Sequence, residues 1–237
     1  MHVHLPKPLH GWREFFGEVA IIVIGVLIAL GLEQAVEYLR EAKFSREAQE
    51  TVRAEIGGDV GQLASRISTE PCIRRRLDEI SSFIDRASGT HAVEILQWVG
   101  RPQVWQMALG WWEAASQSGR ASLLTGEDQA RFAFIYSSLR AVQESENSEQ
   151  ILWAQLRSME GQARLSQTAA SDMRSVLSQA RLADWRVRVG FGQAREAAEQ
   201  LGIRLTARRE GSHSVCIPIG TPRAEALTRI ASPYGEP

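Results

Sequence analysis

Cysteine is scarce in this chain of 237 residues, which contains two, and neither sign of charge is in excess. Two cysteines are too few for a disulfide-dense scaffold or for a four-cysteine zinc site. Lysine and arginine total 27 against 28 aspartate and glutamate residues, which leaves a formal net charge of -1. Binding to nucleic-acid phosphates needs a basic excess. The composition therefore predicts no nucleic-acid partner.

Familiar catalytic motifs are also missing. The chain has no G-x-S-x-G, H-E-x-x-H, Walker or Rossmann glycine pattern. His2, His4 and His10 cluster near the start, but no carboxylate or thiol ligand accompanies them. We expect no enzymatic activity, no cofactor and no metal site.

The most unusual feature is an apolar run from Val19 to Leu32, fourteen residues without a polar side chain. As a helix, the wider stretch 15–36 would be about 33 Å long, which is enough for the bilayer core of about 30 Å. We interpret 15–36 as a transmembrane anchor in a lipid bilayer and 1–14 as a short cytoplasmic tail. A buried helix of a soluble protein and a cleaved signal peptide are the alternatives.

The anchor carries a recognisable pattern. Residues 18–30 read E-V-A-I-I-V-I-G-V-L-I-A-L, and W-R-E-F-F precedes them at 12–16. This combination resembles the E-x-x-I-x-x-I-G-V-x-I-A-L anchor of a widespread group of uncharacterised bacterial proteins, specifically over residues 11 to about 35. The resemblance implies an inner-membrane protein with one N-terminal span and a helical remainder. It implies no activity and no catalytic residues.

Beyond the anchor, apolar residues recur at helical spacing. One stripe runs from Val52 to Ile67, although Gly57-Gly58 is expected to weaken or bend that helix. Thr69-Glu70-Pro71 indicates a stop and a restart, and the next stripe ends near Gly89. A further short helix is expected over 104–115.

The second half of the chain repeats this pattern. Thr125-Gly-Glu-Asp128 resembles a capping box that opens a long helix. The last long stripe runs from Met173 to Leu201, with Asp184 as its one polar intruder and Gly202 as the expected C-cap. Two segments stay open: 92–99 is a short helix or a strand, and the polar run 144–150 is an exposed helical turn or a break.

These elements predict an all-α fold, in which the transmembrane helix continues into an antiparallel helical bundle over 37–202. An irregular C-terminal tail, 203–237, follows, with one short helix expected over 222–230. Cys72 and Cys216 suit a periplasmic disulfide that ties this tail back. Two unrelated buried thiols are the alternative. Positive charges flank the anchor almost equally, so the cysteines are the only indication of orientation.

Within the anchor, Glu18 is a carboxylate about one turn inside the apolar stretch. Such a group either serves a function at membrane depth or reaches back to the headgroups. Gly25 and Ala29 form a small-xxx-small pair, a candidate surface for packing against a second helix.

Two further groups outside the anchor are candidate sites. An anion site would combine six arginines if the fold brings them together, and a solvated face is the alternative; they are Arg74, Arg75, Arg76, Arg204, Arg208 and Arg209. Four tryptophans either fill the bundle core or line an apolar pocket; they are Trp98, Trp105, Trp111 and Trp112.

Together these patterns predict a non-enzymatic, single-pass protein of the bacterial inner membrane, with most of the chain in the periplasm. We expect a scaffold or protein-interaction module that contacts a protein partner or forms a homo-oligomer. The alternative is a ligand-sensing bundle that acts through a separate transducing partner.

Overall fold

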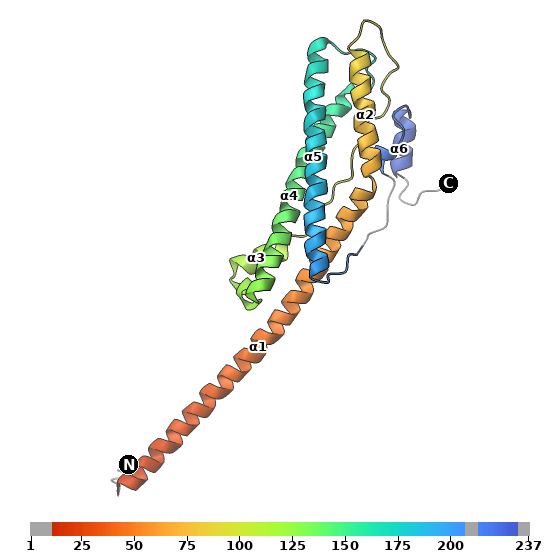
Figure 1. Cartoon of the computed structure of the whole chain (residues 1–237). Helices are drawn as coiled ribbons and strands as arrows, with labels where there is room; N and C mark the ends of the chain where they lie inside the picture. Colours follow the sequence, from red (N-terminus) through yellow and green to blue (C-terminus); the bar gives the residue numbers. More distant parts are fainter. Residues whose placement is uncertain (1–10, 207–212, 232–237) are drawn as a thin grey trace, which may run out of the picture. The chain divides into compact units, whose positions relative to one another are not determined.

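The computed structural model describes residues 11–206 and 213–231, and in these ranges it contains helices and no β-strand (Figure 1). The predicted all-α class is confirmed, whereas the antiparallel arrangement stays a prediction. The α-helices are α1 (Trp12–Ser68), α2 (Glu70–Ala87), α3 (Gly110–Gln117), α4 (Gly126–Leu156), α5 (Gln167–Gln200) and α6 (Arg223–Ala231). Short 3-10 helices are η1 (Arg120–Leu123), η2 (Arg157–Met159) and η3 (Ser214–Cys216).

The chain divides into two compact units, Met1–Gln49 and Glu50–Pro237, and α1 crosses the division. In the first unit every residue of the apolar run Val19–Leu32 is exposed. Its apolar window has a mean hydropathy of 2.6 and no buried residue. By length and composition, α1 is the one described helix suited to crossing a membrane. The short helix α6 lies inside the predicted tail, where a helix was expected.

Local sequence signals set the helix ends. Pro71 stands in the first turn of α2, directly after α1 ends at Ser68. The Thr125 hydroxyl accepts a hydrogen bond from the backbone N–H of Asp128 at 3.2 Å, so the predicted cap opens α4. Gly202 has a φ of +65° after α5, as expected of a residue that terminates a helix.

The second unit buries the apolar stripes predicted for its helices. Val52, Ile56, Val60 and Leu63 of α1 are fully buried. Helices α4 and α5 lie side by side, and α2 packs against α5. Gly190 of α5 faces Val142 so closely that a Cβ would overlap the valine side chain. Gly190 therefore allows α5 to pack closely against α4.

The glycines of α1 have a different role from the expected one. Helix α1 runs without interruption through Gly57 and Gly58. The backbone of residues 203–206 lies against this face, where the Thr206 N–H donates to the Gly57 carbonyl oxygen at 3.0 Å. A Cβ at Gly57 or Gly61 would overlap the carbonyl oxygen of Arg204 or Thr206. These glycines allow a close backbone approach, a long-range contact that local helix propensity does not contain.

Three segments differ from the sequence expectations. Residues 92–99 are neither helix nor strand but part of an irregular coil that extends to Leu109. This coil delays the helix expected from residue 104, so α3 begins at Gly110. The polar run 144–150 does not break α4, and two of its residues, Glu146 and Glu149, are fully buried. Tertiary partners of the coil and of the polar run explain these differences, as described below.

Candidate functional site

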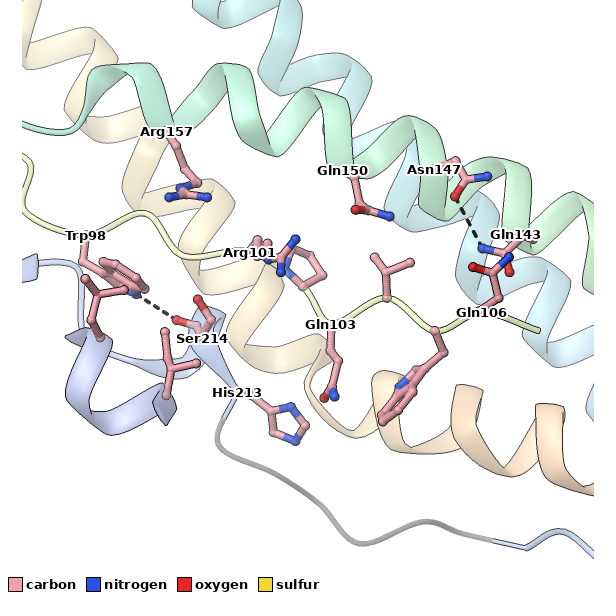
Figure 2. Close-up of a pocket in the computed structure, with 15 residues that line it drawn as sticks. Trp98, Arg101, Gln103, Gln106, Gln143, Asn147, Gln150, Arg157, His213 and Ser214 are labelled. Atoms are coloured by element: carbon pink, nitrogen blue, oxygen red, sulfur yellow. Dashed lines mark hydrogen bonds between the residues drawn. The ribbon is translucent and has the colours of Figure 1, made fainter. Parts of the chain in front are cut away.

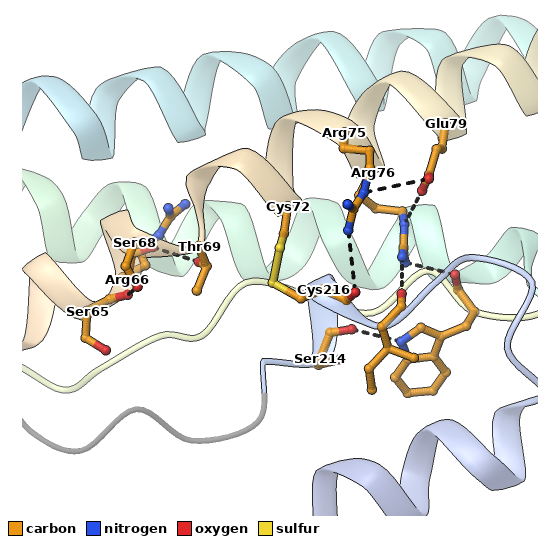
Figure 3. The surroundings of a disulfide bond; sticks show 12 residues. Ser65, Arg66, Ser68, Thr69, Cys72, Arg75, Arg76, Glu79, Ser214 and Cys216 are labelled. Atoms are coloured by element: carbon orange, nitrogen blue, oxygen red, sulfur yellow. Dashed lines mark hydrogen bonds and ion pairs between the residues drawn. A yellow bond between two sulfur atoms is a disulfide. The ribbon is translucent and has the colours of Figure 1, made fainter. Parts of the chain in front are cut away.

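A disulfide and a buried arginine hold the coil and the C-terminal segment against α2 (Figure 3). Cys72 of α2 bonds to Cys216 of η3, with their Cα atoms 5.0 Å apart. One turn further along α2, the fully buried Arg76 donates to the carbonyl oxygens of Trp98, Val99 and Ile217. In a helix or a sheet, backbone N–H groups would bind these carbonyl oxygens, and here the Arg76 guanidinium takes their place. The coil is therefore fixed although it has no regular hydrogen-bond ladder.

Between these segments lies a cavity of about 830 Å³, which we call the amide groove (Figure 2). One wall is the coil from Trp98 to Gln106, and a second is the α4 face that carries Gln143, Asn147 and Gln150. The C-terminal segment closes it with residues between His213 and Ile230. The volume lies within the range of small-molecule sites.

The coil wall of the groove is pinned from both sides. The Met107 N–H donates to the Gln143 side-chain oxygen at 2.9 Å. The Ala108 N–H donates to both carboxylate oxygens of Asp59 at 3.1 Å, and Asp59 itself is 3% exposed. Burial raises the pKa of Asp59 above its ordinary value, although its bond to the Ala108 N–H opposes that shift. Side chains of α1 and α4 therefore hold the coil at the end of this wall.

The four predicted tryptophans have different surroundings. Trp98 is buried, and its indole N–H donates to the Ser214 carbonyl oxygen at 2.9 Å. Trp105 is half-buried and lines the groove. Trp111 and Trp112 are half-buried outside it, and Trp112 stacks on Tyr136 with ring centroids 5.4 Å apart. Trp98 thus belongs to a core cluster and to the groove lining, Trp105 belongs to the lining, and Trp111 and Trp112 lie outside the lining.

The second unusual cluster is a buried ionic network on four helices. Arg66 of α1 donates to both carboxylate oxygens of Glu149 at 2.8 and 2.9 Å and to Asp184 at 3.1 Å. Asp184 also accepts from Arg188 at 3.1 Å, and Arg188 lies 3.6 Å from Glu70. The polar intruder of the predicted α5 stripe is thus a partner of a buried cation.

Glu146 has the weakest pairing in this network. Its carboxylate lies 4.0 Å from the Arg66 guanidinium and has no side-chain hydrogen bond within the described residues. Burial raises the pKa of Glu146 to about 8, the Arg66 charge opposes the shift, and Glu149 adds to it. At neutral pH the carboxyl is therefore mostly protonated, which spares the core an additional buried negative charge.

The Glu146→Gln variant tests this protonation. The folded pKa lies above the ordinary 4.5, so the folded chain holds a proton that the unfolded chain releases between pH 4.5 and 8. The stability contributed by this group is complete below pH 4.5 and falls by about 1.4 kcal/mol per pH unit until about pH 8. We expect the stability difference, variant minus wild type, to grow from pH 5 to pH 8 in urea titrations. A difference that stays constant across this range would contradict the protonated state.

The predicted arginine site is not assembled as expected. Arg76, which was a candidate for the anion site, is not available to bind an anion. Its guanidinium is fully buried and donates hydrogen bonds to carbonyl oxygens and to Glu79. Arg74 pairs with Glu70, and Arg75 lies 3.5 Å from the Cys216 carbonyl oxygen. Arg204 is exposed beside α1, and Arg208 and Arg209 lie outside the described residues. The expected disulfide, in contrast, is present.

The remaining predicted residues lie in the first unit or near the chain start. Glu18, Gly25 and Ala29 are exposed on α1, and no described atom would contact a Cβ at Gly25 within 4 Å. His2, His4 and His10 lie outside the described residues. Within the described residues no group of three or more potential metal ligands gathers.

Comparison with known proteins adds no relative: no family model, no curated protein and no solved structure matches this chain.

Proposed function

We propose that this protein is a non-enzymatic, single-pass protein of a bacterial inner membrane, whose second unit works in the periplasm by binding. The observation that carries the proposal is the exposed apolar run Val19–Leu32 in the N-terminal part of the continuous helix α1. A helix that is apolar on all sides and buried by no other element is stable in lipid rather than in water. The pattern at 12–30 that resembles a bacterial anchor supports the same proposal.

Extraction of membranes with alkaline carbonate tests the anchor. The full chain is expected to stay in the membrane pellet, because the run and its flanks over 15–36 reach the length of about 20 predominantly apolar residues that a spanning helix needs. Ile24→Arg, at the centre of the run, is expected to release a large share of the chain, since arginine there costs about 2.5–3.5 kcal/mol. The control Arg186→Gln, on the exposed surface of α5, is expected to stay in the pellet. A wild-type chain released by carbonate would contradict the proposal.

Ligand binding is the form of this function that the second unit supports best. The amide groove has a fixed coil wall and a volume suited to a small molecule.

A self-associating scaffold is the second candidate, because three apolar side chains share an exposed face of α5. Leu182, Trp185 and Val189 are exposed by 45%, 51% and 38%. Their spacing of three and four places them on one side of the helix. This candidate predicts a detergent-solubilised dimer that Trp185→Ser dissociates in analytical ultracentrifugation. A monomeric wild type would contradict it.

A further inference from the structure

The amide groove has an unusual side-chain chemistry. Five carboxamides line it, from Gln103 and Gln106 of the coil and from Gln143, Asn147 and Gln150 of α4. A carboxamide offers an acceptor oxygen and a donor nitrogen in one plane. Such pairs match the neighbouring hydroxyl groups of a sugar, each of which both donates and accepts. The Gln143 side chain is committed in part to the Met107 N–H, whereas the side chains of Gln103, Gln106 and Gln150 form no hydrogen bond with any described residue.

Several buried polar atoms without partners belong to residues that line the same groove. Trp105 Nε1 and both ring nitrogens of His213 are buried and form no hydrogen bond within the described part of the chain. Arg157 Nε is also without a hydrogen bond, although it lies 3.8 Å from the Glu160 carboxylate. Each buried, unpaired polar group costs about 1–3 kcal/mol. A ligand that supplies the missing partners would recover this energy.

The charges that line the groove are all positive. Arg101 and Arg157 belong to the lining, and no aspartate or glutamate does. Arg101 is exposed and has no ion-pair partner within the described residues. The carboxylate of Glu160 is occupied elsewhere, by the Val99 N–H at 2.9 Å and by Arg223 at 2.7 Å. Because a guanidinium binds a carboxylate through two parallel hydrogen bonds, Arg101 favours an anionic group on the ligand.

Apolar surface in the groove completes the chemistry. Trp105 is half-buried at the coil wall, and Leu227 and Ile230 of α6 also belong to the lining. An indole offers a flat apolar face beside a polar N–H. The C–H face of a sugar ring stacks on such a surface while its hydroxyl groups reach the surrounding amides.

We propose that the amide groove binds a saccharide that carries a carboxylate. This inference rests on the proposed binding function of the second unit. The carboxamides would bind the hydroxyl or acetamido groups, Trp105 would support the ring, and Arg101 would bind the carboxylate. Acidic amino sugars of a cell wall and free uronic acids share this chemistry, so the probes below separate the two sources.

Isothermal titration of the full chain in nanodiscs of neutral lipid tests this binding. N-acetylmuramic acid and glucuronic acid are the acidic probes, and N-acetylglucosamine and glucose are their neutral counterparts. We expect at least one acidic probe to bind at 1:1, with an affinity at least about ten-fold above that of its neutral counterpart. The acidic probe that binds more tightly identifies the source.

Two variants and a matched control locate the site. Arg101→Gln keeps a polar side chain but removes the charge. It is expected to lower the affinity for the acidic probe about ten-fold. This factor corresponds to about 1.4 kcal/mol. Trp105→Phe removes the unpaired N–H and is expected to lower the affinity for acidic and neutral probes alike. The control Arg186→Gln, on exposed α5, removes the same charge and is expected to change neither. Near-ultraviolet circular dichroism verifies that each variant is folded.

Three results would overturn the inference: neither acidic probe binds, neutral probes bind equally well, or Arg101→Gln binds as wild type does. Tighter binding of a triglutamate peptide than of either sugar would also overturn it. These failures differ from failure of the proposed function. If the chain resists carbonate extraction but binds none of the sugars, only the proposed ligand class is contradicted. If carbonate releases the chain, the proposed membrane anchor is contradicted.

Discussion

Replacing Arg66 with methionine is expected to lower the free energy of unfolding by about 3–5 kcal/mol, one of the two largest effects among the substitutions considered. Arg66 is fully buried and is the cation that contacts Glu149 and Asp184 directly. Without it, these carboxylates are left in the core with a weaker compensating charge. Methionine preserves much of the side-chain volume, so the loss reports charge and hydrogen bonds rather than a cavity.

Urea unfolding of the solubilised full chain, followed by tryptophan fluorescence, measures this effect. Adding Glu149→Gln and Asp184→Asn to Arg66→Met is expected to recover part of the loss, because both uncompensated charges are removed together. The surface control Arg186→Met is expected to stay within about 0.5 kcal/mol of wild type. A loss below about 1 kcal/mol for Arg66→Met would contradict the buried network.

Removing the disulfide with Cys72→Ala and Cys216→Ala is expected to lower stability by about 2–5 kcal/mol. The bond closes a loop with a sequence separation of 144 residues. In the chain-entropy model a loop of this size contributes about 5 kcal/mol, because the crosslink restricts the unfolded chain. Reduction of the wild type with dithiothreitol is expected to give the same loss.

The effect is also expected to be local. Cys216 belongs to the segment that carries Ile217, whose carbonyl accepts from Arg76. Hydrogen exchange is therefore expected to accelerate over 213–231 and over the coil near Val99, while α4 and α5 stay protected. Mass spectrometry that finds two free thiols in the native protein, or equal stability of reduced and oxidised chains, would contradict this account.

The regular parts of the fold follow from local signals in the sequence. Pro71, Thr125 and Gly202 mark helix ends by side-chain or backbone geometry that acts within one turn. Apolar spacing likewise gives the buried faces of α1, α2 and α5. The cysteine pair is also predictable, because two cysteines have one pairing partner each.

The buried ionic network and the amide groove could not be predicted from the sequence, for a common reason. Glu146 and Glu149 stand in a polar run, which is typical of an exposed face, and their cation Arg66 lies about 80 residues away. Asp184 within an apolar stripe was the one local signal of a buried polar partner. The amide groove draws its lining from three segments that are distant in sequence, so no spacing rule brings them together.

The coil over 92–109 illustrates the same limit. Its composition suits a strand or a helix, but its carbonyl groups are bound by Arg76, and its N–H groups by Glu160, Gln143 and Asp59. These side chains, together with backbone hydrogen bonds to residues 161–163 and to Ile219, thus replace the ladder that regular structure would provide. The partners are distant in sequence, so local propensity does not describe them.

The two lysines of the chain, Lys7 and Lys43, make the membrane arrangement directly measurable, because they flank the apolar run on opposite sides. The Lys43 side chain is 77% exposed. A membrane-impermeant, amine-reactive reagent is applied to intact spheroplasts and to inside-out vesicles, and the modified lysine is identified by mass spectrometry. With the second unit in the periplasm, Lys43 is labelled in spheroplasts and Lys7 in inside-out vesicles. Labelling of both lysines from the same side would contradict a chain that crosses the membrane.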